Sequence, residues 1–207
     1  MTRANVQAER MFGHAAGALE GMALASRVRA MSLVHERLYQ SGTLGTICLD
    51  EYVGELCEQL ASAGAPQRRG IVLALEVAPV DVGLDLAVPL GLLLNELVSN
   101  SLKHAFPEGR RGAIRVTLAP EVGEGGHADN KLLRLTVHDD GIGLPPDVDR
   151  TTLPTLGLRL VSALSEQLHA KLVFENRDGA CVTLIFHAGG NGAHGPGHAA
   201  DACPGTR

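Results

Sequence analysis

The sequence predicts an α+β fold, a two-layer α/β sandwich in which helices cover one face of a mixed sheet, preceded by a helical region. Two observations lead to this class. Strand-like and helix-like segments are mixed along the chain without strict βαβ alternation. Of the 207 residues, 45% are apolar but only 3% are aromatic, so a globular core is expected and must consist mostly of Leu, Val and Ala.

Two amphipathic helices are expected before the sheet. The first runs from residue 24 to a C-cap at Gly42, and its apolar stripe consists of Leu24, Val28, Met31, Val34 and Leu38. The second helix, which Asp50 or a neighbour can cap, stops in the turn at 64–66. Its apolar face carries Leu49, Val53, Leu56 and Leu60. Residues 1–62 are therefore interpreted as a separate helical region.

The segments that follow mix strand and helix patterns. Residues 71–77 alternate in polarity and predict a strand, and residues 85–105 predict a long, almost wholly apolar helix. Further strands are expected at 114–118 and 132–137, a helix at 156–168, and a final hairpin of strands at 172–176 and 182–186. The globular domain should thus span residues 66–187, and the glycine-rich residues 188–207 are expected to form a disordered tail.

Charge and hydropathy exclude several functions. The net charge is −5, which argues against a general nucleic-acid binder because such proteins are basic. No apolar run approaches the about 18 residues of a transmembrane helix. The first ten residues lack the apolar stretch of a secretory signal. We therefore expect a cytoplasmic protein with no membrane segment in this chain.

Polar residues stand out in the second half of the expected apolar helix. Glu96, Asn100 and Lys103 recur at intervals of four and three, which places them on one helix face. A carboxylate, an amide and an ammonium on one stripe suit a metal–phosphate site, since an amide oxygen can ligate Mg²⁺ and a lysine can contact phosphate. A solvated helix end would show the same pattern, so this segment alone leaves both interpretations open.

Two further segments carry glycines beside candidate ligand-binding groups. Asp139 closes an expected strand just before Gly141 and Gly143, and such glycines let the backbone approach a ligand closely. A buried carboxylate at a strand end can accept a hydrogen bond from an exocyclic amine such as that of adenine. Gly157 and Leu158 open the next expected helix, where backbone N–H groups attract phosphate. Each segment is a weak signal by itself.

Together, the order and spacing of the three segments resemble the GHKL or Bergerat ATP-binding fold, which gyrase, Hsp90, histidine kinases and MutL share. Sensor histidine kinases of the short-lid HWE and HisKA_2 type have motifs similar to NELVSNSLKHAF, DDGIGLP and TLGLRLVSALSEQL. The end of that subfamily's dimerisation helices and the link into its ATPase domain resemble RVRAMSLVHERLYQSG and LDEYVGEL. The resemblance covers residues 24–187.

The resemblance implies a role for each matching residue. Asn100 corresponds to the Mg²⁺-ligating asparagine, Glu96 to the polarising or general-base acid, and Lys103 to the phosphate-contacting lysine. Asp139 corresponds to the aspartate that reads adenine. Thr155 stands where the second glycine box usually has its first glycine. The remaining ATP-binding positions, in the two glycine boxes, are Gly141, Gly143, Gly157 and Leu158.

The phosphoacceptor motif of the subfamily, His-Arg-x-x-Asn-Asn, does not occur in this chain. His14 lies among Gly and Ala without that motif, and His35 belongs to a Val-His-Glu run typical of the second dimerisation helix. The acceptor histidine is therefore expected in trans, or it has been lost with a truncated or misassigned start. Autophosphorylation of this chain alone is not expected.

The resemblance implies the catalytic core of a two-component sensor histidine kinase. Such an enzyme binds Mg²⁺ and ATP, transfers the γ-phosphoryl group to a histidine, and feeds a response regulator. Its expected partners are a second copy in a homodimer and a protein that supplies the acceptor histidine. Two alternatives are a non-catalytic nucleotide-binding or dimerisation regulator of partner kinases and an anti-sigma-type Ser/Thr kinase on the same fold. The helix expected from residue 24 disfavours the last, because anti-sigma kinases lack a dimerisation hairpin.

Overall fold

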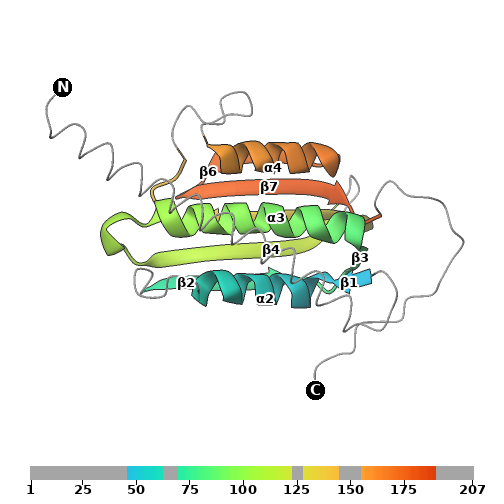
Figure 1. Ribbon diagram of the computed structural model, residues 1–207, viewed down its shortest axis with the longest axis horizontal. Helices are drawn as coiled ribbons and strands as arrows, with labels where there is room; N and C mark the ends of the chain where they lie inside the picture. The colour runs from blue at the N-terminus through green and yellow to red at the C-terminus, as the bar shows by residue number, and fades with distance from the viewer. Residues whose placement is uncertain (1–45, 63–69, 123–127, 145–154, 190–207) are drawn as a thin grey trace, which may run out of the picture.

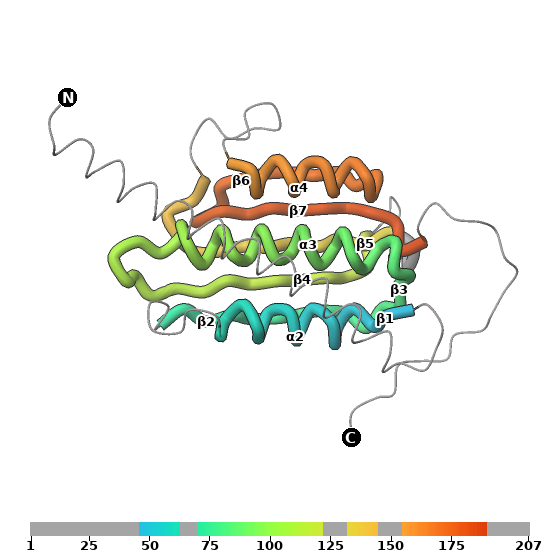
Figure 2. The backbone as a smooth tube through the Cα atoms, viewed as in Figure 1, coloured from blue at the N-terminus to red at the C-terminus, as the bar shows by residue number. Residues whose placement is uncertain are grey.

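The computed structural model describes residues 46–62, 70–122, 128–144 and 155–189. In this part of the chain, three helices cover one face of a sheet (Figure 1). They are α2 (Leu49–Ser62), α3 (Leu84–Asn100) and α4 (Leu156–Gln167). The backbone trace shows α3 between α2 and α4 (Figure 2). The predicted two-layer α/β sandwich is thus confirmed.

Five strands form the sheet, in the order β2-β4-β5-β7-β6. They are β2 (Ile71–Val77), β4 (Gly112–Val122), β5 (Ala128–Asp139), β6 (Lys171–Asn176) and β7 (Ala180–His187). β2 pairs with β4 in parallel, and the other neighbours in this sheet are antiparallel. Because β5 is the central strand, its last residue, Asp139, lies in the middle of one end of the sheet.

Some element boundaries differ from those predicted. β4 and β5 are longer than the predicted strands because they pair with each other as one long antiparallel hairpin. The register of this pairing shifts between Pro120 and Glu121. A small second sheet pairs β1 (Thr46–Cys48) with β3 (Asp81–Gly83), and strands of three residues are too short to show an alternating pattern. Asp50 lies inside the first turn of α2, because the helix already begins at Leu49.

The long helix predicted at 85–105 changes its geometry near its end. It is α-helical as far as Asn100, and Ser101–Ala105 form a π-helical turn. A π turn is wider than an α turn, so side chains beyond it depart from the α-helical face on which the sequence placed them. The predicted stripe is accordingly divided, since Glu96 is buried whereas Lys103 is exposed.

The core lies between the helices and the sheet. α2 buries its predicted apolar face of Leu49, Val53, Leu56 and Leu60. The fully buried Tyr52 of the same helix packs against Gly91 of α3, where a Cβ would overlap the phenol ring and hydroxyl. The absence of a side chain at Gly91 therefore lets α2 lie close beside α3.

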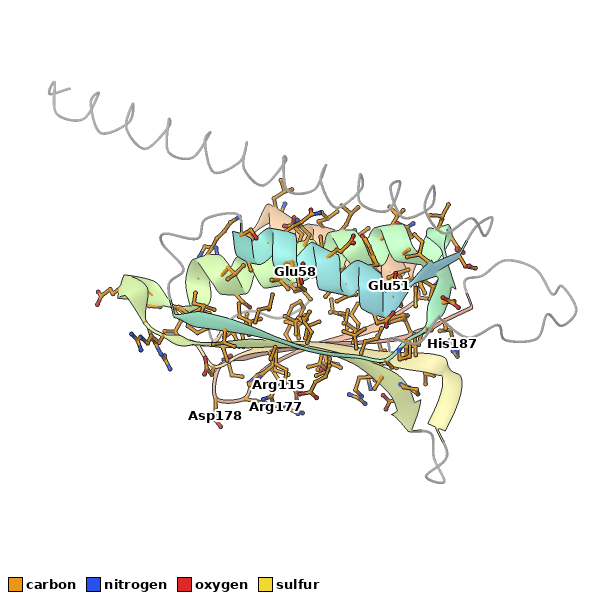
Figure 3. All side chains as sticks on the ribbon, turned by 90° about the horizontal axis from the view of Figure 1, so that it is seen from below. Glu51, Glu58, Arg115, Arg177, Asp178 and His187 are labelled. Atoms are coloured by element: carbon orange, nitrogen blue, oxygen red, sulfur yellow. The ribbon has the colours of Figure 1, made fainter. Side chains whose placement is uncertain are left out.

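The opposite face of the sheet is rich in charge (Figure 3). Arg115 lies 3.7 Å from Glu76, and Arg177 lies 2.8 Å from Glu175. These pairs are largely exposed, so each contributes little to stability. Among the described residues, no helix is long and apolar enough to cross a membrane.

Two predictions concern parts of the chain that are not described. The helix predicted from residue 24 to Gly42 lies outside the described residues. So does the predicted tail, except for Ala188 and Gly189.

Candidate functional site

A cavity of about 510 Å³ opens between the C-terminal end of α3 and the end of β5. This volume is typical of a site for a small organic ligand. Its apolar lining includes Leu97, Ala105, Val137, Leu144, Leu158 and Val182. Its polar side chains are Asn100, Ser101, His104, Asp139 and Thr155. Four of the residues predicted from the sequence therefore line one cavity: Asn100, Asp139, Gly143 and Leu158.

Asp139 is a fixed acceptor in this cavity. Asp139 is buried, with only 2% of its surface exposed. Oδ1 accepts hydrogen bonds from the backbone N–H groups of Gly141 and Ala180, both at 3.1 Å. Oδ2 accepts one from the Ser101 hydroxyl at 2.7 Å. A carboxylate offers about four acceptor positions, so these three donors from the described residues leave one position, on Oδ2, for a ligand.

Gly141 lets the chain turn closely beneath the end of the π turn. A Cβ at this position would lie 2.5 Å from the carbonyl oxygen of Ala105, which is closer than real Cβ contacts come. The next residue, Ile142, donates its N–H to that same carbonyl at 3.0 Å. Gly141 is therefore placed by backbone packing, which also aims its own N–H at Asp139.

Asn176, the last residue of β6, holds the loop at Gly143 and Leu144 in place. Gly143 has a φ of +80°, a conformation that favours glycine. Leu144 donates its N–H to Oδ1 of Asn176 at 2.7 Å, and Nδ2 of Asn176 donates to the Leu144 carbonyl at 3.0 Å. Asn176 thus sets the shape of the loop that borders the cavity.

Glu96 and Gly157 meet where α4 begins. Glu96 is 5% exposed, and a Cβ at Gly157 would lie 2.5 Å from its Oε2 atom. The same Cβ would lie 3.9 Å from Nδ2 of Asn100. A Cβ at Gly157 would therefore displace the end of the Glu96 side chain. Neither Glu96 nor Gly157 lines the cavity itself.

Thr155, which stands where the second glycine box usually has a glycine, caps the N-terminus of α4. Its Oγ1 accepts a hydrogen bond from the N–H of Leu158 at 3.2 Å, which satisfies one of the N–H groups that a helix start leaves unpaired. Leu158 is 8% exposed and lines the cavity. Its contribution to the cavity is thus an apolar side chain, since its N–H is used within the helix.

Two basic side chains follow Asn100 on the π turn. Lys103 is exposed and lies outside the cavity lining, so its ammonium is accessible to an anion beyond the cavity. His104 lines the cavity, and burial together with the neighbouring Lys103 lowers its pKa below the ordinary 6.5. At neutral pH this end of the site therefore combines a cationic lysine with a neutral imidazole.

Sequence reasoning did not identify Ser101 or Asn176 as site residues. In an ideal α-helix, Ser101 would point about 100° away from Asn100, off the predicted stripe. Asn176 lies 32 residues from Leu144 in the sequence, so no local pattern links them. The one available signal was the run of three polar residues at 99–101 in the second half of the predicted helix.

Comparison with protein families gives two matches. The model of the histidine kinase-, DNA gyrase B-, and HSP90-like ATPase family matches residues 85–189. That stretch is half of the chain and contains every residue assigned above to the site. A second model, described as histidine kinase, matches residues 4–63.

Individual proteins give the same result. The chain is 31% identical over 153 residues to Blue-light-activated histidine kinase 2 of Erythrobacter litoralis, covering 72% of this chain and 42% of that protein. It is 30% identical over 142 residues to Sensor histidine kinase PdtaS of Mycobacterium tuberculosis, covering 67% and 26%. The chain thus spans less than half the length of these curated relatives.

A solved structure shares the architecture. The histidine kinase domain from the Erythrobacter litoralis EL346 blue-light activated histidine kinase superposes with a TM-score of 0.69 at 28% sequence identity. The superposition covers 82% of this chain and 81% of that one.

Proposed function

The chain belongs to the family of histidine kinase-, DNA gyrase B-, and HSP90-like ATPases, and on that premise we propose that it is the ATP-binding core of a two-component sensor histidine kinase. It would transfer the γ-phosphoryl group of ATP to a histidine, from which a response regulator is phosphorylated. The observation that carries the proposal is the buried Asp139, with its one open acceptor position inside an apolar cavity.

The cavity suits an adenine ring. Apolar side chains such as Leu97 and Leu158 would contact the faces and edges of the base. The open position on Oδ2 of Asp139 would accept a hydrogen bond from the exocyclic amine. Gly141 would serve the site indirectly, because its close packing against Ala105 lets its N–H reach Asp139. Gly143 would let the bordering loop adopt its positive φ.

The donor set also suits Mg²⁺. The described residues contain no cluster of three or more His, Cys, Asp or Glu side chains that could hold a metal ion. Mg²⁺ bound with nucleotides usually takes one or two protein ligands and completes its shell with phosphates and water, and the Asn100 amide oxygen would be such a ligand. Bound Mg²⁺ would neutralise charge on the phosphates during transfer.

Catalysis would rest mainly on positioning and charge. The buried Glu96, one helical turn before Asn100, would orient the attacking imidazole or accept its proton. The exposed ammonium of Lys103 would contact the phosphates that extend out of the cavity. Gly157 would keep the start of α4 close to Glu96.

We further propose a division of the chain into three parts. Residues 1–62 would form part of the dimerisation and histidine-phosphotransfer region, which the family match at 4–63 supports. Residues 66–187 would form the ATP-binding domain, and residues 188–207 a disordered tail. The match at 4–63 favours a histidine kinase over an anti-sigma-type kinase. A cytoplasmic homodimer, with the acceptor histidine supplied by a partner, completes the proposal.

Titration with a fluorescent ATP analogue tests nucleotide binding. Asp139→Asn should weaken binding about 10- to 150-fold, because a hydrogen bond to a charged group is worth about 1.5–3 kcal/mol. Asp140→Asn is the matched control, since Asp140 is exposed and its carboxylate accepts from the N–H of Ala113 instead. Equal affinities of the wild type and Asp139→Asn would remove Asp139 from the site.

Phosphoryl transfer needs a separate experiment. The chain is incubated with γ-labelled ATP, alone and with a helical hairpin that carries a His-Arg-x-x-Asn-Asn motif. Acid-labile, base-stable label should appear on the hairpin and disappear with Glu96→Gln. Strong labelling of the chain alone, abolished by His14→Ala or His35→Ala, would show that the acceptor lies within the chain.

A further inference from the structure

We propose that Ser101 is a positioning residue that makes Asp139 selective for a base presenting a single N–H donor, as adenine does, and unsuited to guanine. The inference rests on the proposed nucleotide-binding function and adds a determinant of base selectivity to it. It starts from one contact, the 2.7 Å hydrogen bond from the Ser101 hydroxyl to Oδ2 of Asp139.

The hydroxyl of Ser101 is in a position to affect the ligand. Ser101 is 9% exposed, and it lines the cavity together with Asp139. It begins the π turn, and its hydroxyl contacts Oδ2 of Asp139, whereas the N–H of Ala180 contacts Oδ1. In this contact the Ser101 hydroxyl is the donor and Oδ2 of Asp139 the acceptor, so the Ser101 proton points at Asp139.

The remaining acceptor capacity of Asp139 is limited by its donors. Oδ1 is occupied by the N–H groups of Gly141 and Ala180, and one position on Oδ2 is occupied by Ser101. Guanine presents two adjacent N–H donors on one edge, and a carboxylate needs two open acceptor positions to bind both. Adenine presents one amine N–H on the corresponding edge. Asp139 held in this way fits adenine and leaves one guanine donor unpaired, which is costly in a buried site.

Removal of the hydroxyl should therefore change affinity and selectivity together. In Ser101→Ala, the carboxylate loses one of the three contacts that fix its orientation, and a second position on Oδ2 opens. ATP should then bind about 2- to 12-fold more weakly, as expected for the loss of one ordinary hydrogen bond. The affinity for GTP should fall less than the affinity for ATP, so the ratio of ATP affinity to GTP affinity should decrease.

The experiment measures dissociation constants for three nucleotides with the full chain. They are ATP, GTP and purine riboside triphosphate, which lacks the exocyclic amine. Ser101→Ala should weaken ATP binding but leave binding of the deaminated analogue unchanged, because Ser101 acts through the bond between Asp139 and the amine. Ser101→Thr keeps the hydroxyl and should restore ATP binding. Ser99→Ala is the matched control, since Ser99 lies on α3 outside the cavity lining.

Three outcomes would overturn the inference. Unchanged ATP affinity in Ser101→Ala would show that the contact has no effect on recognition. An equal loss for ATP and the deaminated analogue would show that Ser101 only supports the shape of the cavity. A wild-type chain that binds none of the three nucleotides would overturn the proposed function itself, a result distinct from the other two. If Ser101→Ala does not fold, Ser101→Cys, which keeps the size but is a weak donor, takes its place.

Discussion

Gly157 lies against the carboxylate of Glu96, so closely that a Cβ on the glycine would be 2.5 Å from Oε2. The glycine belongs to the first turn of α4 and the glutamate to the buried side of α3. The contact thus joins two helices at the point where the proposed catalytic acid is held. The same packing places Gly157 near the Asn100 amide, so one small residue borders two predicted site residues.

Gly157→Ala should displace Glu96 and reduce phosphoryl transfer more than ATP binding, because neither residue lines the cavity. The overpacking should cost about 1–3 kcal/mol in the free energy of unfolding. Transfer assays and urea unfolding measure the two effects. A shorter acid in Gly157→Ala/Glu96→Asp should recover part of the lost stability.

Gly54→Ala provides the control for that substitution. No atom lies within 4 Å of a Cβ at Gly54, which belongs to α2. The change should raise the free energy of unfolding by about 0.5–1 kcal/mol, because alanine favours helices, and should leave transfer unaffected. A stability loss in Gly54→Ala as large as that in Gly157→Ala would contradict the packing argument.

Asn176→Ala should loosen the loop at Leu144. The substitution removes both hydrogen bonds to the Leu144 backbone, at 2.7 and 3.0 Å. Asn176→Asp keeps an acceptor for the Leu144 N–H but loses the donor, so its effect should be smaller. In nucleotide titrations, ATP affinity should be highest in the wild type, lower in Asn176→Asp and lowest in Asn176→Ala. Equal affinities of all three would show that the loop holds its shape without this side chain.

His104 should make stability depend on pH. The folded chain lowers the pKa of His104 below its ordinary value of 6.5, through burial and through Lys103. The unfolded chain therefore binds the proton more readily, and this contribution to stability is lost as pH falls from above 6.5 toward the lower folded pKa. Urea unfolding between about pH 5 and 8 should show that the free energy of unfolding falls less steeply with decreasing pH in His104→Gln than in the wild type. A steeper fall in the variant would reverse the assigned direction.

Association of the chain should depend on the apolar stripe predicted before residue 42. Met31→Asp places a charge in the middle of that stripe and should convert a dimer into a monomer in sedimentation experiments at micromolar concentration. Arg29→Asp introduces the same residue on the other side of the predicted helix and should leave the dimer intact. A monomer at every concentration of the wild type would count against dimerisation through this segment.

The sequence predicted the fold, and it predicted some of the residues that line the candidate cavity, for identifiable reasons. Asn100 and Asp139 could be found because each lies in a short motif, and the apolar face of α2 could be found because it repeats with the helical period. Ser101 and Asn176 could not be found, since their partners lie 38 and 32 residues away. The π turn after Asn100 was also missed, because a single wider turn leaves no periodic trace in so short a segment.

The contacts of Asp139 also bear on how the protein unfolds. Its donors at Ser101 and Ala180 lie 38 and 41 residues away along the chain, so the binding site exists only when these distant segments have come together. An unfolded chain therefore has no comparable affinity for the ligand, and binding is linked to the folding equilibrium. A nucleotide at 100 times its dissociation constant would raise the free energy of unfolding by about 2.7 kcal/mol. The melting temperature of the chain would thus report on occupancy of the site, independently of any chemistry performed there.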